Sequence, residues 1–204
     1  MKKRAFLKLA ALAGLVGLAP LGAAQAQPEI SAMTMGNADA PVKLTEFASF
    51  TCGHCARFHG DVFKRLKADY IDTGKVHFTY HEVYWDKYAL WAGMVARCGG
   101  EMRFFPIVDM IYERQAEWSR AGEPAAVAEA LRRIGRAAGM EDDSLNACLS
   151  DADTAQALVA WSGDGVAAAG VNATPSLVID GELHSNMSFE DLSALLDARI
   201  AAAQ

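Results

Sequence analysis

The sequence predicts an α/β protein in which a block of helices separates two units that contain strands. Three patterns lead to this prediction: strand–helix–strand over residues 42–83, an Ala-rich helical stretch over about residues 87–169, and two short strands with a helix over residues 176–200. The chain has 204 residues, of which 52% are hydrophobic, so it can form one compact domain or a domain with an insertion.

The first 26 residues have the pattern of a secretory signal peptide. Met1–Arg4 is basic, Leu9–Ala19 is apolar, and Ala24-Gln25-Ala26 offers the small residues that a signal peptidase requires. The apolar run is too short for a membrane anchor, because crossing about 30 Å of hydrocarbon takes roughly 20 residues. We therefore expect cleavage after Ala26 and a mature protein that works in the periplasm.

Removal of this segment makes the chain more acidic. The mature part keeps 15 basic and 25 acidic residues, so its net charge falls from −6 to −10. An acidic protein repels phosphate backbones, and the composition therefore argues against a nucleic-acid partner.

The mature chain is predicted to open with a βαβ unit. Val42–Ser49 is rich in strand-forming residues and follows a turn-like segment that ends in Pro41. Apolar residues then recur at helical spacing from Cys55 to Tyr70, and the alternation in Val76–Val83 indicates a second strand.

The middle of the chain, from about Lys87 to about Ala169, is Ala-rich and helical in period, which indicates four or five helices. Pro106 is expected to open a helical turn or to kink a helix, because proline lacks the backbone donor that a helix interior needs. One apolar stripe illustrates the helical spacing: Val127, Leu131, Ile134 and Ala138.

The last part of the chain regains strand character at Ser176–Ile179. Asp180-Gly181 is a strong hairpin signal before a second short strand, Glu182–His184, and Ser188 is expected to begin a final helix. We therefore assign residues 27–86 and 170–204 to one domain, and residues 87–169 to a helical domain inserted into it.

The motif Cys52-Gly53-His54-Cys55 lies where the first predicted strand gives way to a helix. Cys52 is expected to face the unpaired N–H groups of the helix N-terminus, which stabilise a thiolate over a thiol. His54 is expected to add a further donor or a positive charge. Because this favours the reduced, ionised pair, the motif predicts a disulfide that the protein tends to give away.

The two sulfurs are expected to have different roles. Cys55 lies on the apolar stripe and is predicted to be the protected, resolving thiol, whereas Cys52 is predicted to be the exposed nucleophile that forms a mixed disulfide. Glu46 shares a strand face with Val42 and Leu44, so a buried carboxyl with a raised pKa is expected to exchange protons with a nearby thiol. The alternative is an edge position where Glu46 reaches solvent.

Other uses of the Cys-x-x-Cys pair are less favoured. Structural zinc needs four ligands, and Cys98, Cys148 and the scattered histidines supply no second close pair, so no metal is expected. A purely structural disulfide gains little, because bridging so short a loop removes little chain entropy. In an oxidising compartment four cysteines suggest two disulfides, although three pairings are possible.

Three segments occur in a characteristic order: residues 35–47 (MGNADAPVKLTEF), residues 50–55 (FTCGHC) and residues 170–176 (GVNATPS). Together they resemble the DsbA-like thiol:disulfide oxidoreductases of the thioredoxin superfamily, over nearly the whole mature chain. The resemblance implies a thioredoxin fold with an inserted α-helical domain. It also implies a cis Thr174–Pro175 bond whose loop lies against Cys52 and leaves backbone groups free to pair with an extended substrate.

The same resemblance implies a periplasmic dithiol oxidase that acts on reduced or unfolded exported polypeptides. A quinone-linked, DsbB-like membrane oxidase would regenerate its disulfide, no diffusible cofactor is implied, and a monomer is expected. Two positions differ from the best-known oxidases of the family, which carry Pro where this chain has Gly53 and Val where it has Thr174. Both positions tune the redox potential and the choice of partner.

Cys98 and Cys148 lie in the helical block, where some members of this family carry a second disulfide. A bridge between them would close a loop of about 51 residues, worth roughly 4 kcal/mol in the chain-entropy model. The alternative is a pair of buried free thiols.

Several other residues carry expectations. Phe50 and Thr51 flank Cys52 and are expected to help bind substrate beside Thr174 and Pro175, with ordinary packing as the alternative for Phe50. His59, one helical turn after Cys55, is expected at the surface. Four tryptophans are expected to be packing residues rather than a binding site: Trp85, Trp91, Trp118 and Trp161.

Two rival functions remain open at the level of sequence. One is a disulfide isomerase or reductase kept reduced by a different membrane partner, although family isomerases usually carry a dimerisation segment that residues 27–36 leave no room for. The other is a binding module or chaperone whose disulfide is only structural.

Overall fold

The computed structural model describes residues 28–203, so the predicted signal peptide lies outside the described residues. A five-stranded sheet in the order β1-β3-β2-β4-β5 forms the centre of the fold. β2 and β3 are parallel, and the other neighbours are antiparallel. The strands are β1 (Met33–Met35), β2 (Val42–Ala48), β3 (Val76–Glu82), β4 (Ser176–Ile179) and β5 (Glu182–Ser185).

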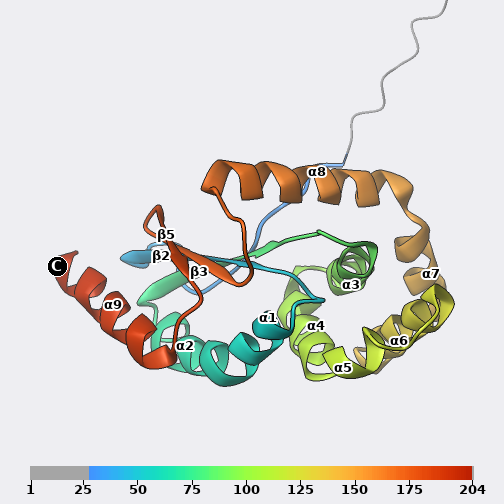
Figure 1. Cartoon of the computed structure of the whole chain (residues 1–204), viewed down its shortest axis with the longest axis horizontal. Helices are drawn as coiled ribbons and strands as arrows, with labels where there is room; N and C mark the ends of the chain where they lie inside the picture. The colour runs from blue at the N-terminus through green and yellow to red at the C-terminus, as the bar shows by residue number, and fades with distance from the viewer. Residues whose placement is uncertain (1–27, 204) are drawn as a thin grey trace, which may run out of the picture.

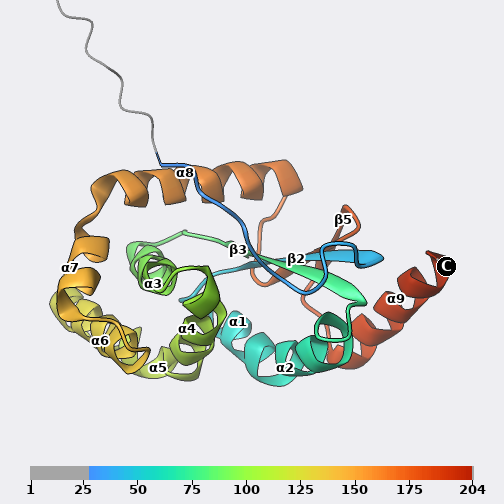
Figure 2. The same cartoon turned by 180° about the vertical axis from the view of Figure 1, so that it is seen from behind.

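Helices cover both faces of this sheet, as Figures 1 and 2 show from opposite sides. α8 (Ala152–Ala169) crosses one face, while the helix that follows β2 and the C-terminal α9 (Phe189–Ala202) lie on the other. The remaining helices gather at one end of the sheet. Successive side chains of β2 point to opposite faces of the sheet. Phe47 therefore packs with Val171 near α8, whereas Leu44 and Glu46 point toward the helices on the other face.

The helix after β2 runs without a break from Gly53 to Ile71. Its apolar stripe is buried, as the spacing of Cys55, Phe58, Val62 and Leu66 predicts. Two π-helical turns interrupt its α-helical geometry. In order, the segments are α1 (Gly53–Phe58), η1 (His59–Phe63), α2 (Lys64–Leu66) and η2 (Lys67–Ile71).

Between β3 and β4 the described chain forms six helices, where the sequence predicts four or five. The extra one, α5, is a single turn that periodicity does not reveal, and Pro106 lies inside α4 rather than opening a helix. Besides α8, the helices are α3 (Lys87–Cys98), α4 (Glu101–Glu113), α5 (Gln115–Trp118), α6 (Pro124–Ala137) and α7 (Asp142–Ser150). The division of the chain into two domains stays a prediction.

Covalent and ionic contacts fix these helices. A disulfide joins Cys98 of α3 to Cys148 of α7, with the Cα atoms 6.0 Å apart, so the pairing implied by the family resemblance is confirmed. Arg97 of α3 makes a two-pronged contact with the fully buried Glu82 of β3, at 2.6 and 2.8 Å. Loss of either charge would leave the other buried and unpaired, so the pair ties α3 to the end of β3.

The C-terminal strands and helix follow their sequence signals. Asp180 and Gly181 have φ angles of 49° and 87°, as a two-residue hairpin turn requires, and Ser188 accepts a hydrogen bond from the backbone of Asp191 at 3.1 Å. The strand β1 has no such signal, because three residues are too few to establish an alternation.

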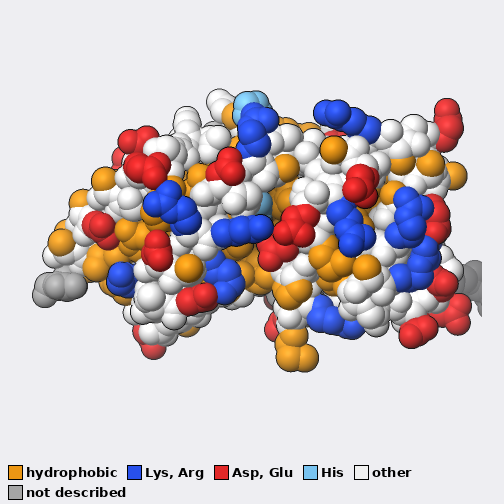
Figure 3. Space-filling view, turned by 90° about the horizontal axis from the view of Figure 1, so that it is seen from below, with side chains coloured by type: hydrophobic (Ala, Val, Ile, Leu, Met, Phe, Trp, Pro, Cys, Tyr) orange, Lys and Arg blue, Asp and Glu red, His pale blue; other side chains and the backbone are white. Residues whose placement is uncertain are grey.

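Two surface features complete the fold. Within the described part of the chain, no helix is both long and apolar enough to cross a membrane. On the face in Figure 3, Lys and Arg side chains are interspersed with Asp and Glu side chains.

Trp118 is buried as expected, whereas Trp85 is 55% exposed in the connection from β3 to α3, so the prediction that it is a packing residue is wrong.

Candidate active site

The connection from β2 to α1 positions Cys52 at the N-cap of the helix. Its backbone N–H donates to the carbonyl of Ser49 at 3.0 Å, and its own carbonyl accepts from Ala56 at 3.2 Å. Cys52 is partly exposed and Cys55, one turn further on, is fully buried. Both are free thiols here, and this pair of exposures is the one that the motif predicts.

The Cys52 sulfur is an anion at neutral pH, because its pKa is lowered from 9.0 to about 5. The main cause is a hydrogen bond from the Cys55 thiol, which partial burial opposes. The Thr174 side chain and the backbone N–H groups of Cys55 and His54 lower the pKa further. Donors that converge on one sulfur stabilise its charged form and make it the nucleophile of the pair.

Cys55 has the opposite character. Burial raises its pKa far above the usual range, and the hydrogen bond to Cys52 and the negative charge of Glu46 raise it further. Cys55 therefore remains a thiol when Cys52 is ionised, and it needs a proton whenever it leaves a disulfide.

The loop before β4 lies against Cys52, as the family resemblance implies. The Thr174–Pro175 bond is cis, and the Cys52 sulfur lies 3.3 Å from the Thr174 carbonyl oxygen, which accepts a hydrogen bond when Cys52 is protonated. This acceptor suits the neutral thiol only, because a thiolate has no proton to donate. Beside the loop lies an open groove of about 550 Å³, lined by His54, by residues 172–176 and by residues 183–186.

His54 and Gly53 lie between the cysteines and are exposed. The Nδ1 atom of His54 lies 2.8 Å from a guanidinium nitrogen of Arg57, which can only donate, so this ring nitrogen is an acceptor. The backbone N–H of His54 is one of the donors that lower the pKa of Cys52. At Gly53 a Cβ atom would meet none of the residues that the structure describes, so packing against them does not require glycine there.

The residues just before Cys52 are held by packing and hydrogen bonds. Phe50 is fully buried against Tyr80 and Tyr112, which corrects the expectation that it forms part of a substrate-binding surface. Its aromatic ring fills the core beneath the active-site turn. Thr51 is partly exposed and its hydroxyl donates to Asp86 at 2.6 Å.

Glu46 is fully buried on β2, as strand alternation predicts. Its Oε2 atom lies 3.3 Å from Nε2 of His59, which is only 3% exposed. The prediction that His59 lies at the surface is therefore wrong. Its ring is stacked between Tyr112 and Phe63, at centroid distances of 4.3 and 4.5 Å. The sequence did indicate that His59 is buried, because it follows Cys55 by four residues and a helix places such a pair on one face.

Sequence reasoning missed two residues of the inserted helices that hold the active-site turn. The side-chain amide of Gln115 donates to the carbonyls of Phe50 and Cys52, at 2.7 and 2.9 Å. The hydroxyl of Tyr112 donates to the carbonyl of Ser49 at 3.3 Å. More than sixty positions separate each of these residues from its partner, and no local pattern predicts such a contact.

Metal binding is one alternative use of the Cys-x-x-Cys pair. Among residues 28–203, no three His, Cys, Asp or Glu side chains converge in a way that could hold a metal ion. The two cysteines of the motif contact each other, and Cys52 also contacts the proline loop.

An ionised cysteine at a helix N-terminus, a buried second cysteine and a proline loop against the first sulfur together define a dithiol site of the thioredoxin type. A profile of the thioredoxin family matches residues 29–198, and the chain belongs to that family.

Two curated relatives come from Rickettsia. A Rickettsia bellii protein provisionally named a protein-disulfide oxidoreductase is 33% identical over 169 residues, which is 82% of this chain and 64% of that protein. A Rickettsia typhi protein of the same provisional name is 30% identical over 166 residues, or 81% of this chain and 60% of its own. The chain thus spans less than two thirds of the length of these relatives.

Solved structures with the same fold include two with high coverage. Alpha-DsbA1 of Wolbachia pipientis matches with a TM-score of 0.77 at 24% identity, over 87% of this chain and 94% of the other. A protein-disulfide isomerase from Novosphingobium aromaticivorans matches with a TM-score of 0.74 at 26% identity, over 83% of this chain and 97% of the other. The predicted thioredoxin fold with a helical insertion is therefore confirmed.

Proposed function

We propose that this protein is a thiol:disulfide oxidoreductase that donates the Cys52–Cys55 disulfide to newly exported proteins. The contrast between the two sulfurs is the main support. At neutral pH the reduced pair holds a thiolate on Cys52, whose pKa is about 5, beside a buried thiol on Cys55. Stabilising the reduced form makes the disulfide a stronger oxidant.

The reaction consists of two exchanges. A substrate thiolate attacks Sγ of Cys52, the Cys52–Cys55 bond breaks, and Cys55 leaves as a thiolate that takes up a proton. A second substrate thiolate then attacks the substrate sulfur of the mixed disulfide and expels Cys52 as a stable thiolate. Two electrons pass from the substrate dithiol to the protein, and the substrate leaves with a new disulfide.

In this scheme the side chains have distinct roles. Cys52 is the nucleophile and Cys55 is the resolving thiol. Gly53 and His54 form the helix start that presents backbone donors, and Glu46 relays a proton to Cys55. Thr174 and Pro175 line the groove where an extended substrate would bind, and Thr51, next to Cys52, would contact the same substrate. The exchange needs no metal and no diffusible cofactor.

The cellular setting belongs to the same proposal. The mature protein works in the periplasm as a monomer, on reduced or unfolded exported polypeptides, and a DsbB-like, quinone-linked membrane protein reoxidises it. The Rickettsia bellii relative carries the name of a protein-disulfide oxidoreductase and the Wolbachia pipientis protein that of a DsbA, and both names support this assignment.

Two measurements test the proposal. The mature protein should oxidise a reduced substrate protein, and its equilibrium with a dithiol buffer should give an oxidising potential. A strongly reducing potential with disulfide-shuffling activity would favour an isomerase or reductase, and no turnover in any assay would favour a binding module.

A matched pair of variants tests the roles of the two sulfurs. Cys55→Ser keeps the nucleophile but lacks the resolving thiol, so it should accumulate mixed disulfides with exported proteins. Cys52→Ser should not. Equal trapping by both variants would contradict the assignment of Cys52 as the nucleophile.

A further inference from the structure

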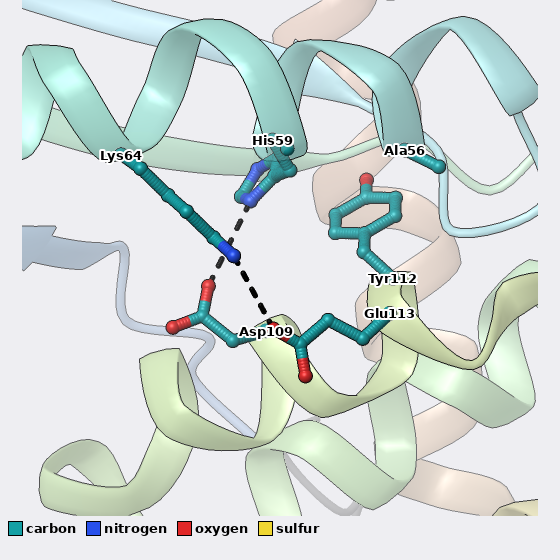
Figure 4. A pocket seen from close by; sticks show the side chains of 7 residues that line it. Ala56, His59, Lys64, Asp109, Tyr112 and Glu113 are labelled. Atoms are coloured by element: carbon teal, nitrogen blue, oxygen red, sulfur yellow. Dashed lines mark hydrogen bonds and ion pairs between the residues drawn. The ribbon is translucent and has the colours of Figure 1, made fainter.

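A small cavity opens beside the ring of His59. It has a volume of about 70 Å³ and lies between the helix after β2 and α4. Figure 4 shows the ring of His59 facing the carboxylate of Asp109 across this space, with Lys64 and Glu113 also lining it. The mechanism proposed above uses none of these residues.

His59 contacts a carboxylate on each side of its ring. Its Nε2 atom is 3.3 Å from Oε2 of Glu46, which is fully buried, and its Nδ1 atom is 4.0 Å from Oδ1 of Asp109, whose side chain is 48% exposed. The His59 ring thus lies between the buried carboxyl group of Glu46 and the solvent-exposed carboxyl group of Asp109.

We propose that His59 carries protons between Glu46 and the solvent in the cavity beside Asp109. The proposal rests on the proposed thiol–disulfide exchange, because it is Cys55 that needs these protons. His59 does not touch the reacting sulfurs, so it is a positioning and relay residue.

The bonding of the buried pair supports this role. Within residues 28–203, neither oxygen of Glu46 and neither ring nitrogen of His59 has a hydrogen-bond partner, so the 3.3 Å contact is close but not aligned. Buried polar groups are rarely left unpaired in a core, because each loses its hydrogen bonds to water. A small movement of either side chain would align the pair, and this is the freedom that a proton relay needs.

The charges around the ring favour an exchange of protons. Glu46 faces it from β2, Tyr80 from β3, and Asp109, Tyr112 and Glu113 from α4. Lys64 lines the cavity and pairs with Glu113 at 3.3 Å. Two carboxylates therefore lie closest to the ring, and histidine is the side chain that most readily gains and loses a proton near neutral pH.

The proton balance is simple. When Cys55 leaves the disulfide as a thiolate, Nδ1 of His59 takes up a proton from water in the cavity as Nε2 passes its own proton to the Glu46 carboxylate, and Glu46 hands that proton on to Cys55. The sequence runs in reverse when the pair is oxidised. No electrons pass through His59.

Rapid mixing of the oxidised protein with dithiothreitol tests this relay, with disulfide opening followed over a range of pH. Removing general acid–base assistance typically costs a hundredfold or more, and a relay one step removed should cost less. We expect His59→Gln to open its disulfide about tenfold more slowly than the wild-type protein and to show a pH profile of a different shape, because proton delivery to Cys55 no longer passes through the ring. His77→Gln, a change in another histidine outside this cavity, should match the wild-type protein.

Chemical rescue separates a relay from a structural role. His59→Ala enlarges the cavity, and added imidazole should restore much of its lost rate, whereas a folding defect would not respond. A wild-type rate and pH profile in His59→Gln, or a slow His59→Ala variant that imidazole does not rescue, would overturn the relay. If the wild-type disulfide itself does not react with dithiothreitol, the proposed function fails, and the relay with it.

Discussion

The ionisation of Cys52 should make the stability of the reduced protein depend on pH, and changing the pH is the simplest perturbation of the site. The pKa of this thiol is about 5 in the folded protein and 9.0 ordinarily. A group with a lowered folded pKa stabilises the fold fully above its unfolded pKa, and this contribution is lost as the pH falls toward the folded pKa. The window therefore runs from about pH 9 down to about pH 5.

The size of the effect follows from the same two values. At pH 7 the Cys52 thiol is protonated in the unfolded chain and ionised in the folded protein. Because pH 7 lies two units above the folded pKa, this ionisation stabilises the folded state by about 2.7 kcal/mol. Solvent screening at the partly exposed sulfur reduces this to about half, or roughly 1.4 kcal/mol. For a two-electron couple that is a shift of about 30 mV toward a more oxidising disulfide.

Denaturant unfolding of the reduced and disulfide forms across this pH range measures the effect, because Cys52 titrates only in the reduced form. The stability of the reduced form relative to the disulfide form should rise between about pH 5 and pH 9. The reduced Cys52→Ser variant should lack this rise. A difference between the two forms that stays constant across the window would refute the ionised Cys52 and the oxidising character argued from it.

Three substitutions test other parts of the site and fold. Gln115→Ala should lower the free energy of unfolding by about 1–2 kcal/mol, because two carbonyls of the active-site turn lose their donor, and denaturant titration would reveal it. Arg97→Met leaves Glu82 as a buried, unpaired charge and should cost about 3 kcal/mol in the same measurement; no loss would contradict the pairing. Thr174→Val removes a side chain that lowers the pKa of Cys52, so the thiolate absorbance should titrate at higher pH than in the wild-type protein.

The order of strands and helices was predictable because it depends on local periodicity. The alternation of β2, the stripe of the active-site helix and the Asp180-Gly181 turn are each determined by residues close in sequence. β1 and α5 escaped prediction because three and four residues do not establish a period. Pairing with β3 and packing of Trp118 in the core stabilise these two elements, and both are tertiary effects.

The site was predictable to the same extent. Local sequence determines that Cys52 caps a helix and that Cys55 and Glu46 are buried, since each of these follows from position on a strand or helix. The errors concern side chains whose surroundings come from distant segments. Tyr112 of the insertion covers His59, so this histidine is buried although its place in the sequence suggests the surface.

The inserted helices are part of the active site and not only an addition to it. α4 covers the buried Glu46–His59 pair with Tyr112 and lines the cavity with Asp109, while Gln115 of α5 fixes the carbonyls on both sides of Thr51. A turn held at its carbonyls cannot swing the Cys52 sulfur away from the helix N–H groups that stabilise it as a thiolate. The helices therefore contribute to the chemistry of Cys52 through the backbone, and changes within them should alter reactivity without touching either cysteine.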